Sequence, residues 1–346
     1  MSQISVLSAA VLSASLIATV SSAQAQKTLY LAGYGGSIET VMKEKVLPAW
    51  EQANDAKIEY LPGNSTTTLA KLQAQKANQE IDVAFIDDGP MSQAIALGFC
   101  KTVEDKGSLS GIYDSAILGS GKALGFGYIA TGLTYNIDMF DENGWDAPTS
   151  WTDLEDPKFK GKVVVPPITN GYGLLTLIKM AKINGGGEAN IDPGFDAMIE
   201  RVGPNILTYE PSSGKLSELF QSGDVAIAAW GHSRAKGLAD TGFPAGFAYP
   251  KEGAVAIMVA TCPVVDSDVP ELSQSLVNYL VSPGVQAILA DELSFGPVNK
   301  DTTLSDEVAS RVPYGLEQVG TMDAIDYSIV NPAREAWTKR WNRTVE

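Results

Sequence analysis

The sequence predicts an α/β fold in two units with a cleft between them. Short apolar segments alternate with helical ones in the first third of the chain, the same alternation resumes beyond residue 160, and extended segments join the two parts. Strands that alternate with helices favour a parallel sheet. The 346 residues suffice for about two domains, each long enough to bury a core.

The first unit contains three strand–turn–helix steps. Strands are expected over residues 29–32, 57–61 and 82–86. Ser37 and Ser65 are expected to cap the next two helices, because a serine hydroxyl accepts a hydrogen bond from the free N–H groups of a first helical turn. The first of these helices should run to about Gln52.

The turns after these strands are all small, polar and glycine-containing, at residues 34–37, 63–66 and 87–90. In a parallel sheet, ligands bind at the carboxyl ends of strands, and the helix N-termini there stabilise anionic or carbonyl oxygens. Ordinary turns select the same residue types. Three such turns along one edge therefore leave a binding edge and plain turn chemistry as equal alternatives.

The second unit repeats this pattern after an extended segment at residues 124–136. Strands are expected at 162–165, 206–209, 225–230 and 247–249, and helices at 172–183 and 212–221. No internal repeat or low-complexity segment is visible. Two α/β units joined by extended segments indicate a bilobal protein.

Residues 1–25 are expected to be a signal peptide. A mostly apolar run over residues 6–20 is followed by Ala23-Gln24-Ala25, which has the small–x–small form of a cleavage site, although no Lys or Arg precedes the run. The mature chain would begin at Gln26, outside the cytoplasm, with no nearby cysteine to carry a lipid. A membrane anchor is the alternative, and the short, serine-interrupted run disfavours it.

The formal net charge is −16. A surface this acidic repels nucleic acid and anionic lipid, so we expect no nucleic-acid partner. Solubility alone accounts for such a charge, while a cationic or zwitterionic ligand would gain mildly from it. In an oxidising compartment the two cysteines, Cys100 and Cys262, either form a disulfide or are two buried thiols.

Catalytic and metal-binding patterns fail on inspection, so we expect no enzyme, no cofactor and no metal site. His232 is the single histidine, which excludes a His-rich zinc site. Residues 231–235 miss the G-x-S-x-G pattern by one residue, because Ala235 replaces the last glycine. Residues 119–123 resemble a phosphate loop but lack its first glycine and the Ser/Thr after the lysine. No two tyrosines are adjacent, which disfavours ferric iron.

Three stretches resemble the extracellular solute-binding proteins of ABC importers, specifically the spermidine/putrescine-type group. They are residues 148–163 (PTSWTDLEDPKFKGKV), residues 249–254 (YPKEGA), and residues 278–287 (NYLVSPGVQA) followed by 295–300 (FGPVNK). Their order and spacing fit that family over essentially the whole mature chain. Each also has a local structural reading: Ser150 can cap a short helix that packs Trp151 into the core.

The resemblance implies a type II periplasmic-binding fold, with extended hinge strands between the lobes. Lobe 1 would hold residues 26–130 and 258–302, and lobe 2 residues 131–257 and 303–346. The protein would be a periplasmic monomer that binds a small molecule and meets an inner-membrane ABC permease, because a free capture protein is useful only in a compartment that retains it. A chemoreceptor partner fits the same fold.

Family ligand positions come from strand ends of both lobes. By this resemblance, the predicted ligand-binding residues are Tyr34, Gly36, Ser37, Asp87, Asp88, Thr131, Asn170, Tyr172, Trp230, His232 and Arg234. Some also have structural readings: Asp87 as a helix cap, Trp230 as core and Arg234 as a solvated helix residue.

The polyamine binders cage ammonium groups with acids and aromatic rings, and this chain departs from them. Residues 169–173 read Thr-Asn-Gly-Tyr-Gly, and residues 255–259 contain neither Trp nor Asp. We therefore expect a zwitterion, such as γ-aminobutyrate or a related amino acid. Asp87 and Asp88 would take its ammonium group, and Arg234, His232 or the turn N–H groups its carboxylate. A polyamine remains the alternative, and ferric ion binding or an exported hydrolase is disfavoured further.

Overall fold

The computed structural model describes residues 26–107 and 109–346, so the predicted signal peptide and its cleavage site at Ala25 lie outside the described residues. Within them, one mixed sheet runs through the molecule in the order β2-β1-β3-β10-β5-β8-β6-β7, with β4 and β9 also paired to β5. The strands are β1 (Lys27–Tyr34), β2 (Ala56–Gly63), β3 (Val83–Asp87), β4 (Ile117–Leu118), β5 (Ala123–Asn136), β6 (Val163–Val164), β7 (Ile206–Thr208), β8 (Ile227–Gly231), β9 (Ala245–Ala248) and β10 (Val255–Pro263).

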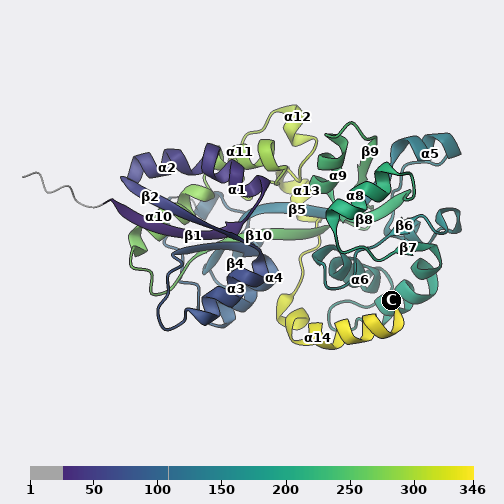
Figure 1. Cartoon of the computed structure of the whole chain (residues 1–346), viewed down its shortest axis with the longest axis horizontal. Helices are drawn as coiled ribbons and strands as arrows, with labels where there is room; N and C mark the ends of the chain where they lie inside the picture. The colour runs from purple at the N-terminus through teal and green to yellow at the C-terminus, as the bar shows by residue number, and fades with distance from the viewer. Residues whose placement is uncertain (1–25, 108) are drawn as a thin grey trace, which may run out of the picture.

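Helices pack around both ends of this sheet (Figure 1). They are α1 (Ser37–Val41), α2 (Leu47–Asn54), α3 (Ser65–Ala74), α4 (Asp88–Ala96), α5 (Ile137–Asn143), α6 (Gly171–Ile183), α7 (Asp192–Ala197), α8 (Ser213–Gln221), α9 (His232–Ala239), α10 (Pro270–Leu280), α11 (Pro283–Leu293), α12 (Asp306–Ala309), α13 (Gly315–Thr321) and α14 (Tyr327–Thr344). Short helical turns are η1 (Met42–Val46), η2 (Leu109–Gly111), η3 (Asp114–Ala116), η4 (Trp151–Glu155), η5 (Pro157–Phe159), η6 (Met198–Val202) and η7 (Gly203–Asn205). None of the helices in the described parts of the chain is long and apolar enough to cross a bilayer.

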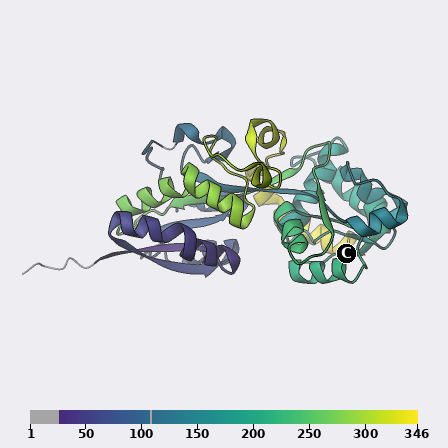
Figure 2. The ribbon, with the colours of Figure 1, turned by 90° about the horizontal axis from the view of Figure 1, so that it is seen from above.

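The buried apolar side chains form separate cores at the two ends of the sheet. We call the part built on β1–β3 with α10 and α11 the N-terminal half, and the part built on β6–β9 with α6 and α14 the C-terminal half. Figure 2 shows α10 and α11, in green, beside the purple N-terminal helices, although these segments are more than 200 residues apart in the sequence. The chain therefore returns to its first half before it ends in its second, and the two-lobed α/β prediction is confirmed.

Phe85, Phe126 and Phe295 pack together in the core of the N-terminal half, and Trp151 and Trp341 lie in that of the C-terminal half. This division supports the lobe boundaries expected from the sequence, which we retain as a proposal.

Two long strands connect the halves. β5 and β10 pair antiparallel from Val255 opposite Thr131 to Thr261 opposite Leu124. β5 is buried along most of its 14 residues, which explains its apolar sequence. In the described residues the chain passes between the two cores along these strands and the segment before α14, so motion of one half against the other must bend them.

The only two cysteines in the sequence, Cys100 and Cys262, form a disulfide within the N-terminal half. It ties the segment after α4 to the returning strand β10, across a separation of 162 residues. Both residues are buried beside Met91 and Val264. Of the two alternatives left by the sequence, the structure has the disulfide.

Several local predictions are confirmed and three are wrong. Ser37 does not cap the first helix, because the N-cap position of α1 is Gly36. Ser150 caps η4 with Asp153 in a reciprocal capping box, and the buried Trp151 donates to the Gly253 carbonyl, so the structural reading of Trp151 is confirmed. Ser65 does not cap α3: Asn64 does, by accepting from the Thr67 N–H at 2.9 Å. The helix expected over residues 37–52 is interrupted by the π-turn η1.

Candidate functional site

A cavity of about 790 Å³ lies between the two halves. Its N-terminal wall comes from the ends of β1 and β3 and from the end of α11, and its opposite wall from the starts of α6, α8 and α9. The apolar side chains of Ile129, Ile257 and Val259, from the connecting strands, also line it. A cavity with polar walls and an apolar base is typical of a small-molecule site.

The N-terminal wall carries two carboxylates, Asp87 and Glu292, and Glu292 is paired with Lys45. Asp87, the last residue of β3, accepts from the Tyr34 hydroxyl at 2.6 Å and from the Ser65 hydroxyl at 3.0 Å. Burial raises the pKa of the Asp87 carboxyl, and these hydrogen bonds oppose the rise. Burial and the neighbouring Asp87 also raise the pKa of Tyr34 well above its usual value, so the phenol stays protonated as a donor. The two hydroxyls therefore hold Asp87 in one orientation.

The opposite wall carries two cations, Arg234 and Lys236, and Lys236 is paired with Asp240. Arg234 lies in the first turn of α9, and among the described residues no carboxylate pairs with it. Its guanidinium interacts with the Tyr172 hydroxyl and opposes the rise in pKa that burial gives this phenol. Gly231 leaves room for the Tyr172 hydroxyl, because a Cβ at residue 231 would lie 2.5 Å from that oxygen.

Three helices begin at this wall, and the partial positive charge of their free N–H groups adds to that of Arg234. Asn170 caps α6 by accepting from the Tyr172 N–H at 2.9 Å. Ser213 and Ser217 of α8 line the cavity with their neighbours. Hydroxyl and N–H donors around a guanidinium are the groups that bind an oxyanion.

Of the predicted ligand residues, seven line the cavity: Tyr34, Gly36, Asp87, Asn170, Tyr172, Trp230 and Arg234. Trp230 is almost completely buried and stacks on Phe220 with ring centres 6.2 Å apart, so its core role outweighs its contact with the cavity. Ser37 begins α1 beside Gly36, and its side chain lies outside the description.

Asp88, Thr131 and His232 do not line the cavity, and this corrects their assignment. Asp88 follows Asp87 by one residue and points into the protein, where it accepts from the N–H groups of Gly89 at 2.9 Å and Met258 at 3.3 Å. Burial, with Asp87 beside it, raises the pKa of Asp88 to about 7. Thr131 is fully buried in β5.

His232 joins the two halves. Its Nδ1 accepts from the Ala130 N–H at 3.0 Å, and its Nε2 donates to the Ser294 carbonyl at 2.6 Å. Burial lowers the pKa of His232 to about 4, so the ring is neutral with one donor and one acceptor. The histidine is a structural link beside the site, because both ring nitrogens are used by the backbone.

Sequence reasoning missed several cavity residues. Ser213 and Gly214 carried the signal used for the other turns, a small polar segment before a predicted helix. Glu292 and Phe295 carried no such signal, because they reach the cavity at the end of α11, more than 200 residues after Asp87 in the sequence. Lys236 and Asp240, also in the wall, pair with each other at 2.6 Å. No three His, Cys, Asp or Glu side chains gather as a metal site in residues 26–107 and 109–346.

Residues 45–313 match the family described as bacterial extracellular solute-binding protein. A putative 2-aminoethylphosphonate-binding periplasmic protein of Salmonella typhimurium is 25% identical over 305 residues, 86% of each chain. The putrescine-binding periplasmic protein PotF of Escherichia coli is 25% identical over 240 residues, 63% of this chain and 64% of that one. An uncharacterized protein of Haemophilus influenzae is 27% identical over 206 residues, and the chain spans only 55% of its length.

Among solved structures, an ABC transporter protein from Clostridium perfringens has a TM-score of 0.80 at 23% identity, covering 92% of this chain and 100% of that one. A putative extracellular solute-binding protein from Bordetella parapertussis has a TM-score of 0.81 at 21% identity, covering 93% and 100%. These likenesses show a shared fold.

Proposed function

Because the chain belongs to the family of bacterial extracellular solute-binding proteins, we propose that it captures a small zwitterion in this cavity and delivers it to an ABC permease in the inner membrane. The homologues are periplasmic binding proteins, and the proposed location is the periplasm. Capture and release require no covalent chemistry.

One observation carries the proposal: the two walls present opposite charges that the remaining charges of the cavity leave unneutralised. Asp87 stands on the N-terminal wall, and Arg234 with three helix N-termini stands on the other. Lys236 and Asp240 compensate each other, and Glu292 pairs with Lys45. A solute with an ammonium group and an oxyanion group can therefore satisfy both walls at once.

The proposed solute is γ-aminobutyrate or a related amino acid, whose carboxylate would bind Arg234 and the helix N-termini. A second candidate is 2-aminoethylphosphonate, named for the Salmonella relative that covers 86% of this chain. The hydroxyls of Ser213 and Ser233 in the C-terminal wall favour this candidate, because a phosphonate has more oxygens to satisfy than a carboxylate, whereas the Ser217 hydroxyl donates to the Ser213 carbonyl. Both compounds share the amine that Asp87 would bind.

A polyamine fits this cavity less well, although PotF binds putrescine by its name. A diamine would place its second ammonium group beside Arg234, because the other carboxylates that line the cavity, Asp240 and Glu292, are already paired with lysines. An unpaired buried cation next to another cation costs several kcal/mol. Ferric ion would bind ionised tyrosines, and the pKa values of Tyr34 and Tyr172, which line the cavity, are both raised.

Solute binding would close the two halves about β5 and β10. A solute stabilises closure only through contacts that it makes in the closed state and not in the open one. Asp87 and Arg234 belong to different halves, so a zwitterion held by both provides those contacts. The proposed mechanism is a hinge motion of two rigid cores.

The test is a thermal-shift screen followed by titration calorimetry on the chain from Gln26, unfolded and refolded with its disulfide intact to remove bound solute. The panel holds γ-aminobutyrate, 2-aminoethylphosphonate, other amino acids, putrescine, spermidine and ferric citrate. A solute at 100 times its Kd should add about 2.7 kcal/mol of stability. Shifts with the zwitterions and none with the polyamines are expected. A shift with polyamines alone would refute the zwitterion assignment.

A further inference from the structure

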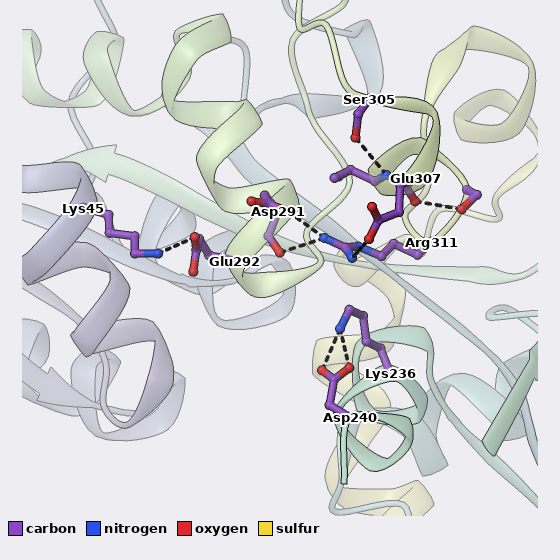
Figure 3. A network of polar contacts seen from close by, with 10 residues as sticks. Lys45, Lys236, Asp240, Asp291, Glu292, Ser305, Glu307 and Arg311 are labelled. Carbon is purple, nitrogen blue, oxygen red and sulfur yellow. Dashed lines mark hydrogen bonds and ion pairs between the residues drawn. The ribbon is translucent and has the colours of Figure 1, made fainter. Parts of the chain in front are cut away.

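Two charged side chains line the cavity from opposite halves. Lys236 lies on α9 in the C-terminal half, and Glu292 lies near the end of α11 in the N-terminal half. Figure 3 shows them in two separate pairs, Glu292 with Lys45 and Lys236 with Asp240. A base and an acid that face the same cavity from different halves attract each other more strongly as the halves approach.

Each of these side chains now pairs within its own half. Lys236 contacts both Asp240 oxygens at 2.6 Å, one turn further along α9. Glu292 contacts Lys45, which lies on η1 beside α11. Side-chain exposure in these pairs ranges from 26% to 60%, so solvent screens both and their exchange costs little.

The other charged side chains nearby already form ion pairs with one another. Arg311 contacts Asp291 at 2.6 Å and Glu307 at 3.2 Å (Figure 3). None of these three side chains lines the cavity. Glu292 is therefore the N-terminal carboxylate best placed to receive Lys236.

A fixed contact between the two helices makes the separation of these charges depend on closure. The His232 side chain, at the start of α9, donates to the carbonyl of Ser294, the residue after α11. Lys236 lies one helical turn beyond His232, and Glu292 two residues before Ser294. Bending at β5, to which His232 is also bonded through the Ala130 N–H, therefore moves the lysine relative to the glutamate.

We propose that Lys236 and Glu292 form an ion pair across the cleft when the halves close, and that this pair strengthens solute binding whatever the solute. The inference rests on the proposed function, because it requires that a solute closes the halves. The pair contacts the protein and not the solute, so it would raise affinity equally for all solutes that induce closure.

A charge-reversal cycle tests the affinity effect, with γ-aminobutyrate and 2-aminoethylphosphonate as calorimetric probes. Lys236→Glu and Glu292→Lys should each weaken binding by about threefold at low salt, and the double reversal should restore it to within twofold. The losses should shrink as salt is raised. Lys215→Glu, the same charge change at an exposed pair on α8 outside the cavity, is the matched control. Additive losses in the double reversal would overturn the proposal.

A cross-linking experiment separates this inference from the proposed function, since it needs no bound solute. In K236C/E292C, with the native disulfide intact, mild copper–phenanthroline oxidation should join the new cysteines during spontaneous closure, faster when a solute of the panel is bound. A bond formed when no panel solute binds would support the closure pair while the proposed zwitterion fails. No bond even with a calorimetrically bound solute would refute the pair and leave the proposed function standing.

Discussion

The two walls of the cavity bind charge in different ways. On the N-terminal wall one half-buried carboxylate, Asp87, is fixed by the hydroxyls of Tyr34 and Ser65. On the C-terminal wall the exposed Arg234 is one donor among several helix N-termini and serines. The uncompensated negative charge is thus concentrated in Asp87, whereas the positive charge is spread over Arg234 and the helix N-termini, so a single substitution should cost more at the first wall than at the second.

The largest effect is expected from removal of the disulfide in the half that holds Asp87. The double variant C100A/C262A removes a cross-link of 162 residues within that half. We expect the free energy of unfolding to fall by about 2–5 kcal/mol. Urea unfolding followed by tryptophan fluorescence measures this loss, and reduced wild-type protein is the control. An unchanged midpoint in both would show that the disulfide does not stabilise this half.

The carboxylate itself comes next. Asp87→Asn keeps the shape of the side chain and leaves the solute's ammonium group without a counter-charge, so we expect Kd to rise by about 100-fold or more. Calorimetry with the best zwitterion of the panel measures it. Asp88→Asn is the matched control, because this adjacent carboxylate faces away from the cavity. Equal losses in both variants would contradict the assignment of Asp87.

Removal of the guanidinium should cost less. Arg234→Gln leaves the helix N-termini and serines in place, so we expect Kd to rise by about 10- to 30-fold, corresponding to about 1.4–2 kcal/mol. The same titration provides the measurement, and Arg343→Gln, at the far end of α14, is the control. A loss as large as that of Asp87→Asn would mean that the basic wall also depends on one residue.

The smallest effect concerns pH and the residue after Asp87. Burial raises the pKa of Asp88 to about 7 in the folded chain, above the value near 3.9 of an unfolded aspartate. The stability that the protonated form contributes is full below about pH 4 and is lost as pH rises through 7. Asp88→Asn stays neutral and should lose less stability than wild type between pH 5 and 8, by on the order of 1 kcal/mol.

Urea unfolding at four pH values checks this difference. Asp114→Asn, at an exposed aspartate, serves as the control and should follow the wild-type curve. Parallel curves for Asp88→Asn and wild type would refute the raised pKa.

The contribution of His232 to stability has the opposite pH dependence. Its pKa is lowered to about 4, so its contribution to stability is present above about pH 6.5 and is lost as pH falls through 4. Because His232 links the halves, acid should also release the contact between α9 and the end of α11.

The alternation of helices and strands, the two units and several of the residues that line the cavity could be predicted from the sequence. The family resemblance pointed to Tyr34, Asp87 and Asn170, all of which line the cavity. The polar turns at strand ends indicated the same edge for Tyr34 and Asp87, because the carboxyl ends of neighbouring strands share one edge whatever the side chains elsewhere. The same rule would have found Ser213 had it been applied to every predicted helix start. Local periodicity and capping determine these features, and both are readable within a few residues.

Which of the two adjacent aspartates, Asp87 or Asp88, faces the cavity depends on the tertiary structure. Asp87 and Asp88 have the same chemistry, and the turn from β3 into α4 sends one to the cavity and the other to the N–H of Met258 on the returning strand. We predicted a ligand role for His232, the single histidine, but hydrogen bonds with Ala130 and Ser294 use both of its ring nitrogens. Glu292 and Lys236 meet the same cavity only because the chain crosses between its halves more than once. Side-chain direction at element ends and the proximity of distant segments depend on long-range packing, which local sequence does not encode.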